Sequence, residues 1–370
     1  MQGPDFSSIL AAIRNTHLDA VAFVPGPNFR RLFARDFHLM ERPLVILLPT
    51  KGKPVAVVPN LEMASFSTLA FDGLVFDWRD ETGYEDAFTS AALSLPQLAG
   101  HCHIGLEARR MRVFEKMVLQ NVFPKADFSD AHEMISSIRV RKSADEVTYL
   151  KKAIKISEAA LESTLLEIFI GQTEKEIESI LLQKLFSHGA DGLSFDPIVA
   201  AGDNSAQPHA QARESYKLKR GDALLIDFGA KYKGYNADIT RTFFIGEVSD
   251  FDRAFYNTVL DANRTGIAAT RAGVSAHFID DTVQCCLEKS KFSEFKRHKT
   301  GHGLGLDVHE APQIMRGNHY ILEPGVVFTV EPGLYRLGEC GVRIEDNVVV
   351  TENGVDCLTN FSRDLRVICA

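Results

Sequence analysis

The feature that most constrains the fold is an apolar, strand-like run that ends in an acidic residue followed two positions later by glycine. LLIDFG places Asp227 at the end of one such run, and VFTVEPG places Glu331 at the end of another. Each run follows a helix-like segment that begins in a similar way, after residues 171–173 and after residues 273–275. Recurrence at a fixed spacing is typical of internal duplication. The sequence therefore predicts two related halves, each with helices followed by a sheet.

Two helix starts can be located in the first half. Ser143 and Glu146 have the spacing of a capping box, in which two side chains satisfy backbone N–H groups at the start of a helix. Thr173 and Glu176 repeat that spacing. We expect a long helix from the first box, with apolar positions continuing toward Gly171, and a second helix after it.

The segment before these helices has another pattern. Short apolar runs such as LVILLP and PVAVVP alternate with helix-like segments such as SSILAAIRNTHLD, which is typical of an α/β layer. The chain of 370 residues is long enough for two domains of ~100 to 200 residues. We predict a smaller domain over residues 1–134, with a scaffold or oligomerisation role, and a second domain over residues 135–370.

Charge and cysteine usage exclude several classes of protein. A net charge of −8 argues against nucleic acid or an anionic membrane as the main partner. The first residues, MQGPDFSSIL, lack an export signal, and no apolar stretch approaches the ~20 residues that cross a membrane. The cysteines lack C-x-x-C spacing, so we expect free thiols and a cytoplasmic protein. They are Cys102, Cys285, Cys286, Cys340, Cys357 and Cys369.

The segment after the first acidic run predicts a hairpin. If its turn centres between Tyr232 and Lys233, opposed residues have numbers that sum to 465, which pairs Asp227 with Asp238. Carboxylates directly opposite each other lie about 5 Å apart and repel. A compensating charge is therefore expected.

A second acidic hairpin is expected in the second half, where Glu331 ends one strand and Glu345 lies in the next, GVRIEDNVVVT. Four converging carboxylates would be balanced by two divalent cations, whereas burying them unpaired costs several kcal/mol per ion. A dinuclear metal site is the first interpretation, and a protonated carboxyl dyad is the alternative.

A nitrogen ligand is expected from His302 in HKTGHGLGLDVHE, a glycine-rich stretch that predicts a site-forming loop. One histidine beside several carboxylates suits Mn²⁺, Fe²⁺, Co²⁺ or Zn²⁺ better than Ca²⁺. The glycines are not a dinucleotide fingerprint, because no helix pattern follows them.

In order, D-x10-D, GHG, TVEPG and RIED resemble the motifs of the pita-bread metallopeptidases, the superfamily of methionine aminopeptidases and Xaa-Pro peptidases. The resemblance covers the chain from about residue 136 onward. The preceding segment resembles the N-terminal domain of creatinase, prolidase and aminopeptidase P, which favours the Xaa-Pro branch. The implied fold class is α+β, a pita-bread catalytic domain with pseudo-twofold duplication after a smaller α/β creatinase-like domain. The family's five ligand positions correspond to Asp227, Asp238, His302, Glu331 and Glu345.

The resemblance also implies roles around the metals. His209 is similar to the family's substrate-pocket histidine, His298 to the histidine four residues before the ligand, and His309 to the one that contacts the scissile region. Arg343 in GVRIED matches a family arginine near the active site. Glu331 is the expected general base.

The implied reaction is hydrolysis of the bond before proline in small peptides. Mn²⁺ is the first expectation for the two metal ions, with Co²⁺, Zn²⁺ or Fe²⁺ as alternatives, and the family suggests a homodimer. Many prolidase-like members carry arginine four residues after the His309 position to hold a dipeptide carboxylate. Gln313 stands there and Arg316 is only a substitute, which leaves dipeptidase and aminopeptidase P activity open. A metal-free creatinase-like hydrolase and a non-catalytic binding protein are the remaining alternatives.

Overall fold

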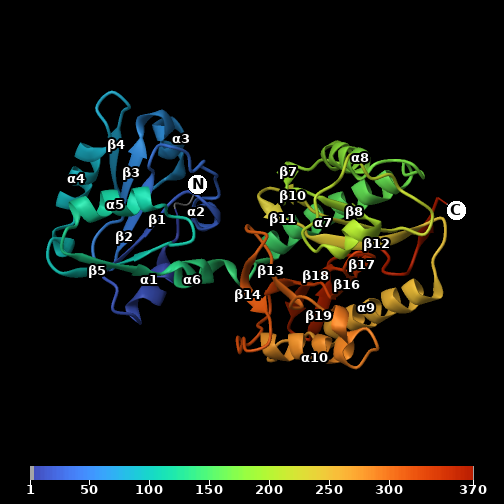
Figure 1. Ribbon diagram of the computed structural model, residues 1–370. Helices are drawn as coiled ribbons and strands as arrows, with labels where there is room; N and C mark the ends of the chain where they lie inside the picture. The colour runs from blue at the N-terminus through green and yellow to red at the C-terminus, as the bar shows by residue number, and fades with distance from the viewer. Residues whose placement is uncertain (1–3, 370) are drawn as a thin grey trace. The chain divides into compact units, whose positions relative to one another are not determined.

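The computed structural model describes residues 4–369, which form two compact units that meet in sequence between Arg139 and Val140 (Figure 1). Each unit has its own hydrophobic core. No helix within residues 4–369 is both long and apolar enough to span a membrane. All six cysteines are free thiols.

The first unit is a mixed six-stranded sheet in the order β4-β3-β2-β1-β5-β6, with helices on both faces. Side chains alternate along β2, so that Val45 and Leu47 pack with α4 and α5 while Ile46 and Leu48 pack with α1 and α2. The predicted α/β layer is confirmed. The elements are α1 (Ser7–Arg14), β1 (Ala20–Phe23), α2 (Pro27–Phe33), β2 (Val45–Pro49), β3 (Val55–Pro59), α3 (Met63–Phe66), β4 (Leu74–Trp78), α4 (Glu85–Leu93), β5 (Cys102–Leu106), α5 (Val113–Val122), β6 (Ala126–Asp130) and α6 (His132–Ser136).

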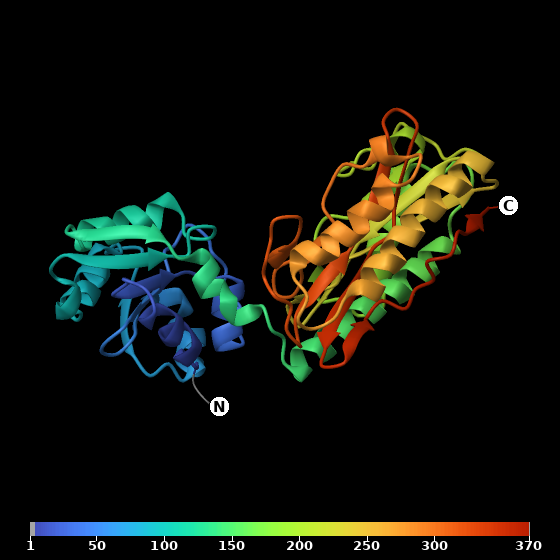
Figure 2. The same cartoon turned by 90° about the horizontal axis from the view of Figure 1, so that it is seen from below.

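In the second unit the strands lie between the green helices α7 and α8 and the orange helices α9 and α10 (Figures 1 and 2). A four-stranded sheet, β20-β12-β9-β8, belongs to the first half and a five-stranded sheet, β14-β13-β15-β18-β19, to the second. The helices are α7 (Ala144–Leu165), α8 (Glu174–Ser187), α9 (Asp250–Ala269) and α10 (Ala276–Glu288). The strands are β7 (Gly192–Leu193), β8 (Ile198–Ala201), β9 (Ala223–Phe228), β10 (Ala230–Tyr232), β11 (Tyr235–Asn236), β12 (Ile239–Ile245), β13 (Gly301–Gly303), β14 (Glu310–Ile314), β15 (Val327–Val330), β16 (Gly333–Arg336), β17 (Cys340–Arg343), β18 (Asp346–Thr351), β19 (Gly354–Cys357) and β20 (Val367–Ile368).

The two halves of this unit repeat each other in detail. Before α8, the N–H of Gly171 donates to the carbonyl of Leu218 at 2.9 Å, and before α10, that of Gly273 donates to Leu322 at 2.9 Å. Both glycines have positive φ, 96° and 85°, which favours glycine over other residues. The predicted internal duplication is confirmed by this shared entry into the second helix of each half.

Both predicted capping boxes are present. Ser143 accepts from the N–H of Glu146 at 3.3 Å, and the Glu146 carboxylate accepts from the N–H of Ser143 at 2.9 Å. Thr173 and Glu176 make the same pair of bonds at the start of α8. The first box begins the 22-residue α7, one face of which packs on the sheet that carries part of the site.

We predict that Ser143→Ala lowers the free energy of unfolding by about 1 kcal/mol, because the N–H of Glu146 loses its acceptor. Thr148→Ala is the matched control: its hydroxyl bonds the Ala144 carbonyl on the exposed side of the same helix, where changes stay within about 0.5 kcal/mol. Urea unfolding followed by circular dichroism measures both. Equal losses in the two variants would contradict the capping role.

Candidate metal centre

The first acidic hairpin turns one residue later than predicted. Tyr232 pairs with Tyr235, so the two-residue turn is Lys233–Gly234. Both turn residues have positive φ, 47° and 82°, as a type I′ hairpin turn requires. The sequence cue was the glycine, which takes the second central position of the turn.

This register changes which residues oppose each other. Asp227, near the end of β9, faces Thr240 of β12, so the predicted direct pairing of Asp227 with Asp238 is wrong. Asp238 precedes Thr240 by two positions, and strand side chains alternate, so both carboxylates still point to one face. Asp227 and Asp238 are 8% and 4% exposed, so their repulsion is poorly screened by water.

The second acidic hairpin is present. Val330 of β15 pairs with Asp346 of β18, and farther along Gly333 of β16 pairs with Arg343 of β17. The same register through the gap between these pairs places Glu331 opposite Glu345. Each hairpin therefore brings two carboxylates to one cavity.

His302 lies on β13 and not in the predicted loop, with Gln313 of β14 as its pairing partner. Its Nε2 is 3.2 Å from a carboxylate oxygen of Glu331 and 3.6 Å from one of Asp238. Its Nδ1 is 3.2 Å from the carbonyl oxygen of Gly303. With a metal bound, a proton on Nδ1 would be donated to that carbonyl and leave the Nε2 lone pair to the metal; without metal, Nε2 lies at hydrogen-bond distance from Glu331.

The carboxylates perturb one another strongly. Burial, followed by the charges of the neighbouring carboxylates, raises the pKa values of Asp238 and Glu345 well above the ordinary range. Burial also raises the pKa of Asp227, although Arg343 opposes the rise. Glu331 differs. Burial is the largest single effect and raises its pKa, but the hydrogen bond from His302 and the charges of His302, His298 and Arg343 together lower the pKa to about 2.

Arg343 is the one arginine within residues 4–369 that donates to any of these four carboxylates. Its guanidinium donates to Asp227 at 2.6 Å, to Thr240 Oγ1 at 3.0 Å and to the Tyr335 hydroxyl at 2.8 Å. Thr240 donates in turn to Glu345 at 2.6 Å. Thr240 and Tyr335 were not predicted from the sequence, although the alternation of threonines at 240 and 242 in an apolar strand was a signal for Thr240.

One cavity of about 710 Å³ gathers every predicted site residue. His309 stacks edge-on against His302 at 4.2 Å between ring centroids, and burial, followed by the charge of His302, lowers its pKa to about 4. His298 bonds the Tyr335 hydroxyl at 2.8 Å, and burial lowers its pKa as well. The predicted residues in the lining are His209, Asp227, Asp238, His298, His302, His309, Glu331, Arg343 and Glu345.

The two residues considered for holding a substrate carboxylate lie elsewhere. Neither Gln313 nor Arg316 is among the residues that line this cavity. The amide of Gln313 donates to the carbonyl of Glu310 at 3.1 Å. Arg316 forms ion pairs with Asp281 at 2.9 Å and Glu288 at 2.8 Å on α10.

The donor set fits divalent cations. Oδ1 of Asp227 and Oδ1 of Asp238 are buried and have no hydrogen-bond partner among residues 4–369. Ligand atoms of Asp238, His302 and Glu345 lie within 4.8 Å of one another. Carboxylate oxygens with one imidazole nitrogen suit first-row divalent metals. Asp227, Asp238, His302, Glu331 and Glu345 could together hold such ions.

We predict that the metal-free protein becomes less stable as pH rises. Asp238 and Glu345 release protons near pH 4 in the unfolded chain but keep them to higher pH when folded. Their contribution to stability is therefore full below about pH 4 and is lost as pH rises through the raised pKa values. The lowered pKa of Glu331 changes the stability only in more acidic solution, because at higher pH this carboxyl is ionised in both the folded and the unfolded chain.

Thermal unfolding of chelator-treated protein between pH 5 and pH 8 measures this dependence, and Asp238→Asn should flatten it because one charge is removed. A slope that this substitution leaves unchanged would contradict the assignment to the carboxylate cluster.

Known proteins match this chain over both units. Residues 148–352 match the model of metallopeptidase family M24. An uncharacterized peptidase of Staphylococcus aureus (strain USA300) is 30% identical over 357 residues, which are 96% of this chain and 99% of that protein. The structure of a prolidase from Thermococcus sibiricus superposes with a TM-score of 0.91 at 32% identity and 97% coverage of both chains.

The structure of an X-Pro aminopeptidase from Thermotoga maritima gives a TM-score of 0.80 at 32% identity and covers 97% of this chain and 98% of that one. These full-length matches confirm the predicted fold, a pita-bread domain after a smaller α/β domain. The chain belongs to metallopeptidase family M24.

Proposed function

We propose that this protein is an Xaa-Pro peptidase, which hydrolyses the peptide bond between an N-terminal residue and proline with two divalent metal ions. The observation that carries the proposal is the convergence of four carboxylates, three of them buried and Glu331 partly buried, and four histidines on one cavity of about 710 Å³. Likeness to a prolidase and to an X-Pro aminopeptidase supports the choice of proline. The substrates would be small peptides with proline in the second position.

In this proposal Asp238 and Glu345 would be shared by the two metal ions, Asp227 would complete one site, and His302 with Glu331 would complete the other. Mn²⁺ is our first candidate, ahead of Co²⁺, Zn²⁺ or Fe²⁺. Bound metals would supply an activated water and balance the charge of the tetrahedral intermediate.

The other residues would handle protons and orient the substrate. Glu331 would act as the general base, because its carboxylate lines the cavity and is ionised near pH 7. His309 is neutral near pH 7, since its pKa is about 4, and can donate a hydrogen bond to a substrate carbonyl without repelling the metals. His209 would donate from another part of the cavity wall. Arg343 would orient Asp227 directly, and His298 would support Arg343 through the Tyr335 hydroxyl.

A preference for longer peptides is favoured over strict dipeptidase activity by two observations. Arg316 is occupied by acidic residues of α10, so it offers no guanidinium for a dipeptide carboxylate. Ile198 and His209 of the cavity wall also line a neighbouring cavity of about 570 Å³, which leaves room for further residues. Assays of Xaa-Pro and Xaa-Pro-Ala with the same first residue would distinguish the two activities.

We further propose that residues 1–134 form a scaffold or oligomerisation domain, that residues 135–370 form the catalytic domain, and that the protein acts as a cytoplasmic homodimer. The six free thiols are consistent with a reducing compartment.

We predict that Xaa-Pro peptides are cleaved and matched Xaa-Ala peptides are not, and that a chelator abolishes cleavage until Mn²⁺ is restored. Chromatography of the released N-terminal residue measures both effects. Equal cleavage of the two sets would refute proline specificity, and turnover after complete metal removal would refute the metal-dependent mechanism.

We predict that His309→Ala lowers kcat/KM by roughly 100- to 1,000-fold while metal content stays constant, because the loss of one transition-state donor has an effect of this size. His101→Ala, in the first unit, is the control and should leave kcat/KM unchanged. Steady-state kinetics with metal analysis of both proteins makes the comparison. A fall in metal content that matched the loss of activity would instead make His309 a determinant of metal binding.

A further inference from the structure

The two acidic residues assigned as bridging ligands lie where regular strand pairing is interrupted. Asp238 lies between β11 and β12, and Glu345 lies between β17 and β18. They also come from different hairpins, so no single strand ladder fixes the distance between them. If both carboxylates are to hold the same pair of metal ions, other contacts must fix the backbone at each position.

The backbone of Asp238 is held by one side chain of the other hairpin. The Asn347 carboxamide accepts from the N–H of Asp238 at 3.2 Å and also donates its own N–H to the Asp238 carbonyl. Asn347 is fully buried on β18. A single carboxamide thus replaces the two hydrogen bonds that a neighbouring strand would supply.

The backbone of Glu345 is held in the reverse direction. Its N–H donates to the carbonyl of Thr240 at 3.1 Å, and its carbonyl accepts from the Arg241 guanidinium at 2.7 Å. Thr240 and Arg241 both belong to β12 of the first hairpin. Each bridging candidate is therefore fixed by residues of the opposite hairpin, and the two attachments are reciprocal.

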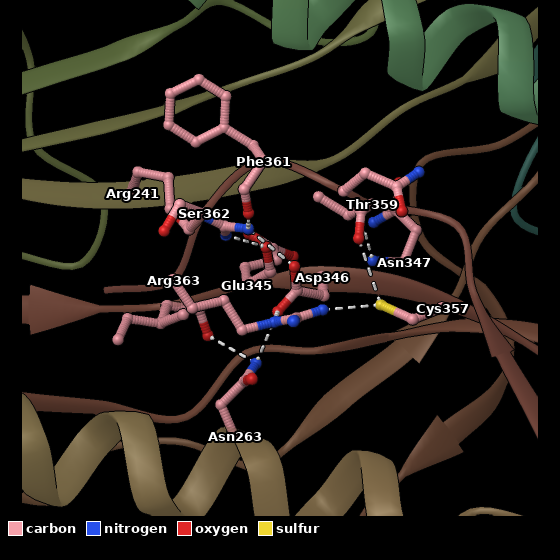
Figure 3. Close-up of polar contacts among 12 residues, drawn as sticks. Arg241, Asn263, Glu345, Asp346, Asn347, Cys357, Thr359, Phe361, Ser362 and Arg363 are labelled. Carbon is pink, nitrogen blue, oxygen red and sulfur yellow. Dashed lines mark hydrogen bonds and ion pairs between the residues drawn. The ribbon is translucent and has the colours of Figure 1, made fainter. Parts of the chain in front are cut away.

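Buried ionic contacts fix Arg241 itself (Figure 3). Asp346, fully buried, accepts from Arg241 at 2.7 Å, from Arg363 at 2.6 Å and from Asn263 of α9 at 3.0 Å. The remaining guanidinium N–H groups of Arg241 donate to the carbonyls of residues 240, 361 and 362 at 2.9, 2.8 and 3.0 Å. Because these hydrogen bonds hold the guanidinium on several sides, Arg241 has little freedom to move away from the Glu345 carbonyl.

We propose that Asn347 and Arg241 are positioning residues that set the gap between Asp238 and Glu345 and thereby the affinity for the metal pair. This inference rests on the proposed metal-dependent function. Neither side chain lines the cavity, so their effect on the metals is exerted through the backbones of the two ligands. Partners of this kind typically change metal affinity by 10- to 100-fold when they are removed.

The test compares two variants that remove hydrogen bonds to the backbones of Asp238 or Glu345 with one that removes a nearby hydrogen bond involving neither residue. Asn347→Leu removes both bonds to Asp238 at similar volume, and Arg241→Lys keeps a cation for Asp346 but lacks the fork that also reaches Glu345. The control is Thr359→Val, because Thr359 Oγ1 accepts from the N–H of Asn347 at 3.0 Å but touches neither ligand. Mn²⁺ affinity and stoichiometry are measured by titration calorimetry, and stability by thermal unfolding without metal.

We expect Asn347→Leu and Arg241→Lys to weaken Mn²⁺ binding by 10- to 100-fold. Thr359→Val should lose stability but bind Mn²⁺ like the unmodified protein. Unchanged affinity in both positioning variants, or an equal loss in the control, would overturn the inference. Should Asn347→Leu not fold, Arg241→Lys decides by the same criterion. An unmodified protein that binds no Mn²⁺ would refute the proposed function and the inference together, whereas normal binding with unaffected variants refutes the inference alone.

Discussion

Mutual repulsion among buried carboxylates is the constraint on which the rest of the second unit depends. Two like charges 4 Å apart near a protein surface repel by about 4 kcal/mol, and four such groups line one cavity here. Arg343 offsets part of the charge at Asp227, and His302 does so at Glu331. Among residues 4–369, no lysine or arginine donates to the carboxylate of Asp238 or Glu345, and burial, followed by the charges of the neighbouring carboxylates, raises their pKa values. The hairpins that bring these groups together are stable in ionised form only with added positive charge.

The sequence predicted the strands and helices of this unit because their signals are local. Capping boxes, apolar runs and the recurrence of an acidic residue before glycine lie within a few neighbouring positions. The turn was predicted one residue too early. This error changes the sum of paired residue numbers by two, which preserves the alternation of strand side chains, so both aspartates still point to one face. His302 was harder to place, because the glycines beside it are compatible with a loop and also with a strand that lies very close to its neighbours. The structure shows the second case: a Cβ on Gly301 would lie 1.9 Å from the carbonyl oxygen of Thr329.

What the sequence did not predict depends on contacts between distant segments. Arg241 and Asn347 reach ligands that are 104 and 109 positions away, and no local pattern marks either residue. The substrate is harder still to predict, because specificity resides in cavity shape. The sequence suggested Gln313 as a determinant of specificity, whereas in the structure its amide donates to the Glu310 carbonyl and the residue does not line the cavity.

The last strand, β20, completes the sheet of the first half by pairing in parallel with β12. Just before it, the carbonyls of Phe361 and Ser362 receive the guanidinium of Arg241, 120 and 121 positions earlier in the chain. On the ribosome, therefore, Arg241 emerges long before its acceptors have been synthesised. A chain that stops before residue 361 has this cation without these carbonyl partners, so the proposed positioning of Glu345 by Arg241 would require the segment around residues 361 and 362.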